Sequence, residues 1–64
     1  MNCNIGDLVT RQGDNRLGIV MSEAFDFRHN ELAVEVLTHH FHTGEESIWI
    51  WLLEDIEVLS EVRN

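Results

Sequence analysis

The fold is decided by residues 47–59, which read SIWIWLLEDIEVL. Over residues 47–53 the apolar side chains alternate between two sets, Ile48, Ile50 and Leu52 on one face and Trp49, Trp51 and Leu53 on the other. A period of two is typical of a β-strand, whereas on a 3.6-residue helical period the apolar positions of 48–61 scatter almost all round. The sequence at 53–55 then predicts a short helical turn, and residues 56–59 predict a further strand.

Three other apolar runs precede this stretch, and turn signals separate them. Glycine, aspartate and asparagine cluster between the runs because they tolerate the backbone angles that tight turns need. Working outward, we expect a turn at 6–7, a strand entry at 8–9, a loop at 12–15, strands at 17–22 and 32–39, and a polar turn at 43–46.

The stretch between the second and third runs is less regular. Phe25 and Phe27 alternate with charged residues, which favours a strand that continues into a long hairpin and turns near Asn30. Gly18, inside a strand, predicts either a bulge or a close approach of another part of the chain.

Together these runs predict an all-β protein, a small barrel of about five antiparallel strands with one helical turn near residues 53–55. Short strands cannot bury an apolar face alone, and closing the sheet buries one face of each strand. The expected core residues are Val9, Ile19, Val34, Val36, Ile48, Ile50, Ile56 and Val58. If Ile48 and Ile50 point inward, both tryptophan side chains point outward.

Length and composition predict one domain over residues 1–64 with no intramolecular cross-link. The single cysteine, Cys3, excludes an intramolecular disulfide and is interpreted as a small apolar residue near the first strand. The chain carries twelve carboxylates against four arginines, a formal net charge of −8. Phosphate repels such a surface, so nucleic-acid binding is disfavoured and basic protein partners are favoured.

The pattern resembles the small SH3-like β-barrel proteins of tailed bacteriophages. The resemblance covers roughly residues 5–59, and its cues are Gly6–Val9, Gly18–Val20, Val34–Val36, Trp49–Trp51 and Glu54–Val58. It implies an SH3-like barrel and a phage origin, and it implies no catalytic residues. The same opening occurs in KOW-type ribosomal and transcription-factor barrels, but this chain lacks their basic binding face, which puts RNA binding in doubt.

No enzyme template fits the sequence. The serines lack a nucleophile-elbow setting, the four glycines are dispersed rather than forming a phosphate loop, and twelve acids in a short chain pair by chance. We therefore expect no catalysis and no cofactor. The histidines leave one metal alternative open, because His40 and His42 would share a strand face at a spacing that lets both reach one ion. The same cluster, beside carboxylates, could instead respond to pH.

The remaining feature is a set of aromatic and acidic residues. The rings are Phe25, Phe27, Phe41, Trp49 and Trp51. Exposed aromatic patches mark interaction surfaces, and SH3-like barrels bind peptides through aromatic-lined grooves. The alternative is that one or both indoles cap the end of the barrel or the hairpin and stay mostly buried. The predicted partner-binding residues are Trp49, Trp51, Phe27, Glu45, Glu46, Glu54 and Asp55.

The function predicted from the sequence is a non-catalytic protein-interaction module that binds a basic protein partner or a second copy of itself. An acidic decoy that blocks a host nucleic-acid-binding protein is the alternative, because a charge of −8 suits that role. A metal- or pH-responsive module is a further alternative. The sequence shows no signal peptide and no apolar run long enough to span a bilayer, so we expect a location in the host cytoplasm or in the virion.

Overall fold

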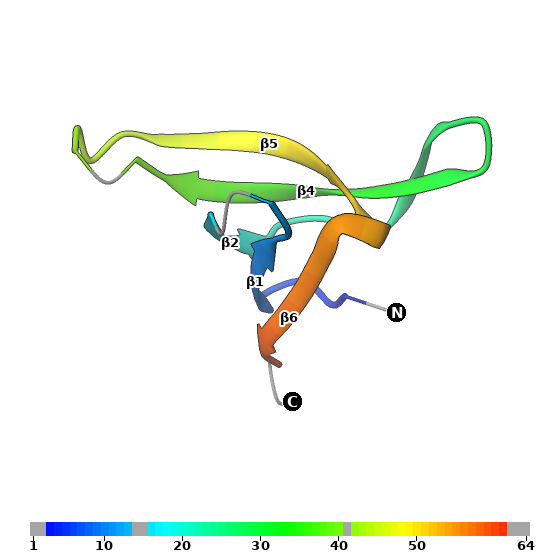
Figure 1. Ribbon diagram of the computed structural model, residues 1–64, viewed down its shortest axis with the longest axis horizontal. Coiled ribbons are helices and arrows are strands. Elements are labelled where there is room, and N and C mark those ends of the chain that lie inside the picture. Colours follow the sequence, from blue (N-terminus) through cyan, green and yellow to red (C-terminus); the bar gives the residue numbers. More distant parts are fainter. Residues whose placement is uncertain (1–2, 14–15, 41, 62–64) are drawn as a thin grey trace.

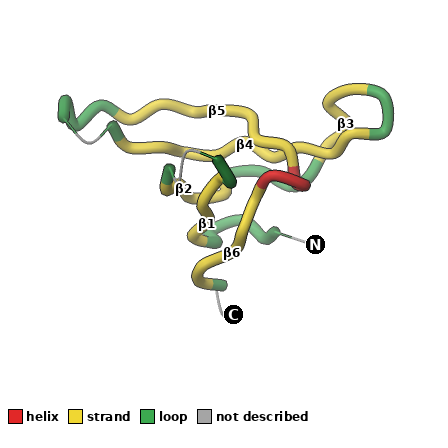
Figure 2. Tube along the Cα trace, in the orientation of Figure 1, coloured by secondary structure: helices red, strands yellow, loops and turns green. Residues whose placement is uncertain are grey.

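The computed structural model describes residues 3–13, 16–40 and 42–61, and these form one antiparallel sheet of six strands. The elements are β1 (Leu8–Arg11), β2 (Leu17–Val20), β3 (Phe25–Arg28), β4 (Glu31–His39), β5 (Glu46–Leu52), the 3-10 turn η1 (Leu53–Asp55) and β6 (Ile56–Ser60). The predictions of an all-β protein and of a helical turn at 53–55 are confirmed. Figure 2 shows that turn as the single helical segment drawn, between β5 and β6.

Strand β4 is the centre of the sheet. It pairs with β5 along one edge and with both β2 and β3 along the other, and the sheet continues from β2 through β1 to β6. Figure 1 shows the β4–β5 hairpin lying across the top of the molecule, with β1, β2 and β6 beneath it. The sheet is therefore strongly bent, so that strands far apart in the pairing order face each other across the core.

The expected closed sheet is wrong, and so is the strand count of five. Among the described residues, β5 pairs with β4 alone and β6 with β1 alone, which leaves the sheet open. The sixth strand is β3, which forms the expected hairpin with β4. Its turn contains Asn30 at φ 62°, a left-handed conformation that asparagine tolerates better than most residues.

The predicted turn at 6–7 anchors the first strand. Gly6 has φ 98°, and the Asn4 N–H donates to a carboxylate oxygen of Asp7 at 2.8 Å. The Asp7 N–H returns a bond to the Asn4 carbonyl at 3.0 Å, while the Asp7 carbonyl accepts from the Val20 N–H at 3.0 Å. Asp7 is almost fully buried, and the bond from the Asn4 N–H offsets part of the cost of removing its carboxylate from water.

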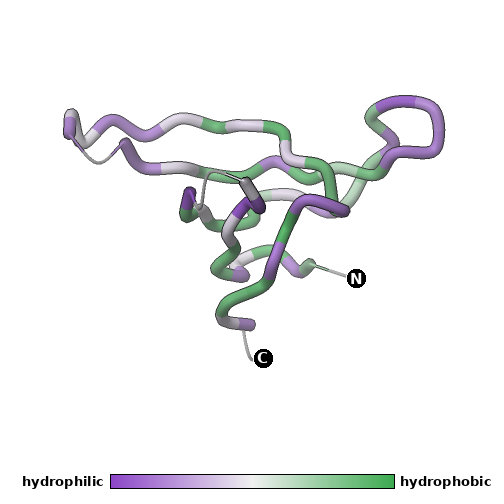
Figure 3. Tube along the Cα trace, viewed as in Figure 1, coloured by the Kyte–Doolittle hydropathy of each residue, from purple (hydrophilic) through white to green (hydrophobic). Residues whose placement is uncertain are grey.

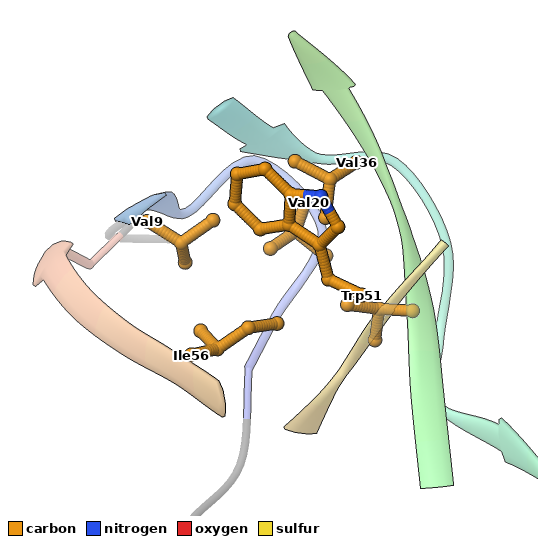
Figure 4. Packing of buried hydrophobic residues seen from close by; sticks show 6 residues of the cluster. Val9, Val20, Val36, Trp51 and Ile56 are labelled. Atoms are coloured by element: carbon orange, nitrogen blue, oxygen red, sulfur yellow. The ribbon is translucent and has the colours of Figure 1, made fainter. Parts of the chain in front are cut away.

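The core lies between the β4–β5 hairpin and the strands beneath it (Figure 4). Four expected core residues, Val9, Val34, Val36 and Ile56, are buried, and Val58 packs against them. Ile19 is only half-buried, and its neighbour Val20 takes the core position. Because the two residues are adjacent on β2, they point to opposite faces, and the sequence is apolar on both.

The expected burial of Ile48 and Ile50 is also wrong. Ile48 is 58% exposed and Ile50 is 47% exposed, whereas Trp51 is 1% exposed. The pairing of Val34 with Trp51 places the indole on the buried face of β4. Figure 4 shows the ring of Trp51 projecting among the buried aliphatic side chains. One large ring thus fills the space under the hairpin, and the isoleucines face outward.

Gly18 is where β2 passes directly under that ring. A Cβ atom there would overlap Cγ1 of Val36 and would lie 3.4 Å from Cη2 of Trp51. The sequence predicts either a bulge or a close approach at Gly18. The register between β2 and β4 runs without a shift, so the close approach is confirmed and the bulge is not. The absence of a side chain at this position therefore lets β4 and the indole pack against β2.

Candidate interaction surface along strand β5

Six of the seven predicted partner-binding residues lie in one continuous segment, residues 45–55, which contains β5, the turn before it and η1. The structure does not gather them into one compact patch. Glu45 and Glu46 lie at the start of β5, and Glu54 and Asp55 lie beyond its end, separated by a strand about 20 Å long. The seventh residue, Phe27, lies on β3. The predicted set is therefore a linear feature with acids at both ends.

The outward placement of both indoles is wrong for Trp51, which belongs to the core. Its Nε1 is buried and has no hydrogen-bond partner among the described residues. Trp49, two residues earlier on the same face, is 43% exposed. Only Trp49 can contribute an indole surface to a partner.

The exposed isoleucines are the surface residues that the sequence interpretation missed. Ile48 and Ile50 share the outer face of β5, where Ile48 pairs across to Leu37 and Ile50 pairs to Glu35. An apolar depression of about 190 Å³ lies on this face, between β2, β4 and the start of β5, and Ile19, Leu37 and Glu46 line it. No signal in the sequence separates this outer set from the inner one, because both alternating sets are apolar.

The arginines lie over the chain's own aromatic rings. The guanidinium carbons of Arg11 and Arg16 lie 5.3 Å and 5.2 Å from the ring centroids of Trp51 and Trp49, respectively. These contacts join the β1–β2 hairpin to β5 across the core without backbone pairing. Cation–π contacts of this geometry contribute about 0.5–1 kcal/mol each at exposed sites.

Phe27 is contacted in the same way. The guanidinium carbon of Arg28 lies 5.1 Å from the centroid of its ring. Three of the four arginines of the chain thus lie against aromatic rings, and the chain carries twelve carboxylates against these four cations. The chain as a whole therefore has a strong excess of negative charge.

One edge of β5 has no strand beside it in the described part of the chain. The His40 N–H donates to the Glu45 carbonyl at 2.7 Å, just beyond the paired residues His39 and Glu46. This bond determines which residues of β5 direct their backbone N–H and C=O groups toward β4. In an antiparallel pair, residues alternate between facing the partner and facing away. It follows that Ser47, Trp49 and Trp51 direct their backbone groups to β4, while Glu46, Ile48, Ile50 and Leu52 direct theirs to the open edge.

The acids mark both ends of this edge. Figure 3 shows hydrophilic residues at the β4–β5 turn and at η1, with hydrophobic positions along the strand between them. Beside η1, a groove of about 450 Å³ is lined by Gln12, Glu31, Leu32, Leu53 and Glu54. The C-terminal end of the edge therefore adjoins a concave surface that carries two carboxylates and apolar side chains.

The predicted histidine pair does come together. The ring centroids of His40 and His42 lie 6.1 Å apart, and Nδ1 of His40 accepts the Thr43 N–H at 3.3 Å within the β4–β5 turn. Phe41, between them, lies outside the described residues. Within the described ranges, no group of three or more histidine, cysteine or acidic side chains is placed to hold a metal ion. The pair is thus part of the turn, and metal binding there stays a prediction.

Cys3 packs against the core, as expected from the sequence. Burial raises the pKa of its thiol, and the negative charge of Asp7 raises it further. The neutral thiol is therefore favoured, which is the opposite of what a nucleophilic cysteine requires.

Comparisons with known proteins assign no family. No protein-family model matches the sequence, and searches of curated proteins and of solved structures found no significant match. The residues from 3 to 61 that the structure describes include no helix long and apolar enough to cross a membrane.

Proposed function

We propose that this chain is a non-catalytic protein-interaction module that binds a basic protein partner along β5 and the acidic turns at its two ends. The observation that carries the proposal is the coincidence of exposed apolar side chains with an excess of carboxylates. Ile48, Trp49 and Ile50 are each more than 40% exposed, and the chain has a net charge of −8. Exposed apolar residues flanked by charge are typical of surfaces that another protein covers.

We extend the proposal to an SH3-like architecture and a phage origin. Two features support the architecture. The main pairing path places β6 next to β1, so that the chain returns to its first strand, and the acidic 3-10 turn stands immediately before that last strand. The arginine contacts from the β1–β2 hairpin to Trp49 and Trp51 support a barrel-like core in which side chains join strands that do not hydrogen-bond. A phage-encoded protein of this kind would act in the host cytoplasm or the virion.

Binding to peptides of graded charge tests the proposed function. The chain is titrated with peptides that share an alternating apolar core and differ only in carrying lysine or glutamate at their ends. We expect the lysine peptides to bind, with an affinity that falls as salt is raised, because salt screens exposed charges over about 10 Å at 0.1 M. Equal affinity for both charge classes, or binding to neither, contradicts the proposal.

A charge-reversed variant distinguishes charge-specific binding from nonspecific association of peptides with the chain. Replacing Glu45, Glu46, Glu54 and Asp55 by lysine should transfer the preference from the lysine peptides to the glutamate peptides. All four residues lie in turns or at strand ends, and none belongs to the buried core. The far-ultraviolet dichroism of the variant should therefore match that of the parent.

A further inference from the structure

We infer that the partner segment binds as an additional β-strand along the open edge of β5, and that it is an extended segment with basic residues at both ends. This inference rests on the proposed function and adds to it the conformation and charge pattern of the bound segment. An edge strand with unpaired backbone groups is a template for strand addition, and peptides use such edges with main-chain hydrogen bonds for affinity.

The composition of β5 suits strand addition. Its seven residues, ESIWIWL, contain neither proline nor lysine, two common devices that protect an edge, and Glu46 is the single charge. The backbone groups of Ile48 and Ile50 face the open edge, and their side chains extend over the outer face. An added strand would pair with these groups and place alternate side chains beside the two isoleucines.

The charge pattern decides between a second copy of this chain and a different protein. In antiparallel self-pairing centred on Trp49, Glu46 of each copy lies opposite Leu52 of the other, and the acidic turn lies beside the other copy's η1. Parallel self-pairing places each acidic turn next to its own equivalent. Either arrangement brings carboxylates together, and like charges opposite one another destabilise a strand pair.

A segment with lysine or arginine at both ends has the complementary pattern. One basic end meets Glu45 and Glu46, and the other meets Glu54 together with Glu31, which lines the same groove. Because β5 spans seven residues, the two basic ends are expected to stand about eight residues apart, with apolar or β-branched residues between them. The acidic ends thus act against self-association and in favour of such a partner.

The test uses a peptide of about ten residues with two lysines at each end and alternating valine and threonine between them. Hydrogen exchange of backbone amides is measured by NMR with and without saturating peptide. We expect exchange at Ile48, Ile50 and Leu52 to slow by more than tenfold, because these N–H groups face the open edge. A peptide of the same sequence with every central residue N-methylated keeps its charges and should lose at least tenfold in affinity.

Two variants of one residue provide the matched control. The Ile50 N–H faces away from β4, the one strand that pairs with β5 in the described part of the chain, so Ile50→Pro should retain the sheet and lose at least tenfold in peptide affinity. Ile50→Thr also replaces the isoleucine side chain, but it keeps the N–H and should bind within about threefold of the parent. If Ile50→Pro fails to fold, the N-methylated peptide still decides the question.

The outcomes separate this inference from the function on which it rests. Slowed exchange along β5 and loss of binding on N-methylation support it. Binding of the lysine peptide with slowed exchange confined to the groove around Gln12, Leu32 and Leu53 overturns strand addition and leaves the proposed function standing. A symmetric dimer that forms through β5 without peptide also overturns it, since the edge would then be occupied by a second copy. Failure of every lysine peptide to bind overturns both.

Discussion

Adding one methyl group at Gly18 tests whether β2 packs under β4 and Trp51 as closely as the structure requires. A Cβ atom there would overlap Cγ1 of Val36 and would lie 3.1 Å from the carbonyl oxygen of Leu37. Gly18 does not have a positive φ, so the backbone accepts alanine and the cost of Gly18→Ala comes from the overlap alone. Overpacking a core in this way costs about 1–3 kcal/mol.

Part of that cost is offset. Alanine restricts the unfolded chain more than glycine does, which stabilises the folded state by about 0.4–1 kcal/mol where the backbone fits. The expected net loss in the free energy of unfolding is therefore about 1–2 kcal/mol. A domain of this length has a free energy of unfolding of roughly 3–10 kcal/mol, and 1 kcal/mol moves the melting temperature by about 4–8 °C. Gly18→Ala should melt about 5–15 °C below the parent.

Thermal and urea melts of Gly18→Ala, Val36→Ala and the double variant provide the assay. Val36→Ala removes both γ-methyl groups, which destabilises the core but leaves room for the new methyl at residue 18. The double variant should therefore lose less than the sum of the two single losses, by about 1 kcal/mol or more. A Gly18→Ala variant as stable as the parent, or strictly additive losses, would refute the packing of β2 against β4.

Three further outcomes test other parts of the structure. Trp51→Phe should lower the free energy of unfolding by about 1–2 kcal/mol and leave red-shifted fluorescence from exposed Trp49. Trp49→Phe should change the free energy of unfolding by less than about 0.5 kcal/mol and leave blue-shifted fluorescence from buried Trp51. The reverse pattern would show that Trp49, and not Trp51, lies in the core. Gly44→Ala should cost about 1 kcal/mol in urea melts purely from its φ of 74°, since no atom lies within 4 Å of an added Cβ; an unchanged urea midpoint would show that residue 44 does not adopt this conformation. The raised pKa of the Cys3 thiol, caused first by burial and then by Asp7, should make its alkylation at pH 8 slower in the folded chain than in urea; equal rates would contradict that burial. The same shift adds stability below the ordinary thiol pKa and loses it as pH rises through the folded-state value.

The local turns could be predicted from the sequence because their chemistry is local. The turn at Gly6 and Asp7, the hairpin turn at Asn30 and the 3-10 turn at 53–55 all depend on residues within a few positions of one another. A glycine or asparagine with positive φ, or a carboxylate that accepts a nearby N–H, requires no knowledge of the rest of the fold.

The buried face of β5 could not be predicted, because its sequence is apolar on both faces. Alternation fixes which side chains share a face but not which face is covered. The choice between Trp51 and the pair Ile48 and Ile50 depends on the volume beneath the β4–β5 hairpin, which three-dimensional packing determines. The gap above Gly18 accommodates a ring, so the tryptophan face is buried. The same ambiguity explains why Val20, and not the expected Ile19, occupies the core position on β2.

The candidate site was predictable as a set of residues and not as a shape. The acids at 45–46 and 54–55 flank an apolar strand in the sequence itself. That this strand lies at an open edge depends on whether the sheet closes, and closure is a property of all the strands together. The expected closed barrel hid most strand edges, and the sequence therefore placed binding on the side chains of Trp49 and Trp51.

Reversing the charge at only one end of β5 should allow two copies of the chain to pair along their open edges. In the variant Glu54→Lys with Asp55→Lys, the lysines of one copy would meet Glu45 and Glu46 of another when two β5 strands pair antiparallel. Self-pairing that is repulsive in the parent would then be attractive at both ends of the interface, with the neutral stretch from Ser47 to Leu52 between them.

We expect this one-ended variant to form a dimer at low salt and to dissociate as salt is raised, measured by native mass spectrometry and by sedimentation. The variant with all four acids reversed again carries like charges at both ends, and it should stay monomeric although its total change in charge is larger. Dimerisation of both variants would point to reduced net repulsion as the cause. Dimerisation of neither would show that the acidic ends do not control pairing along β5.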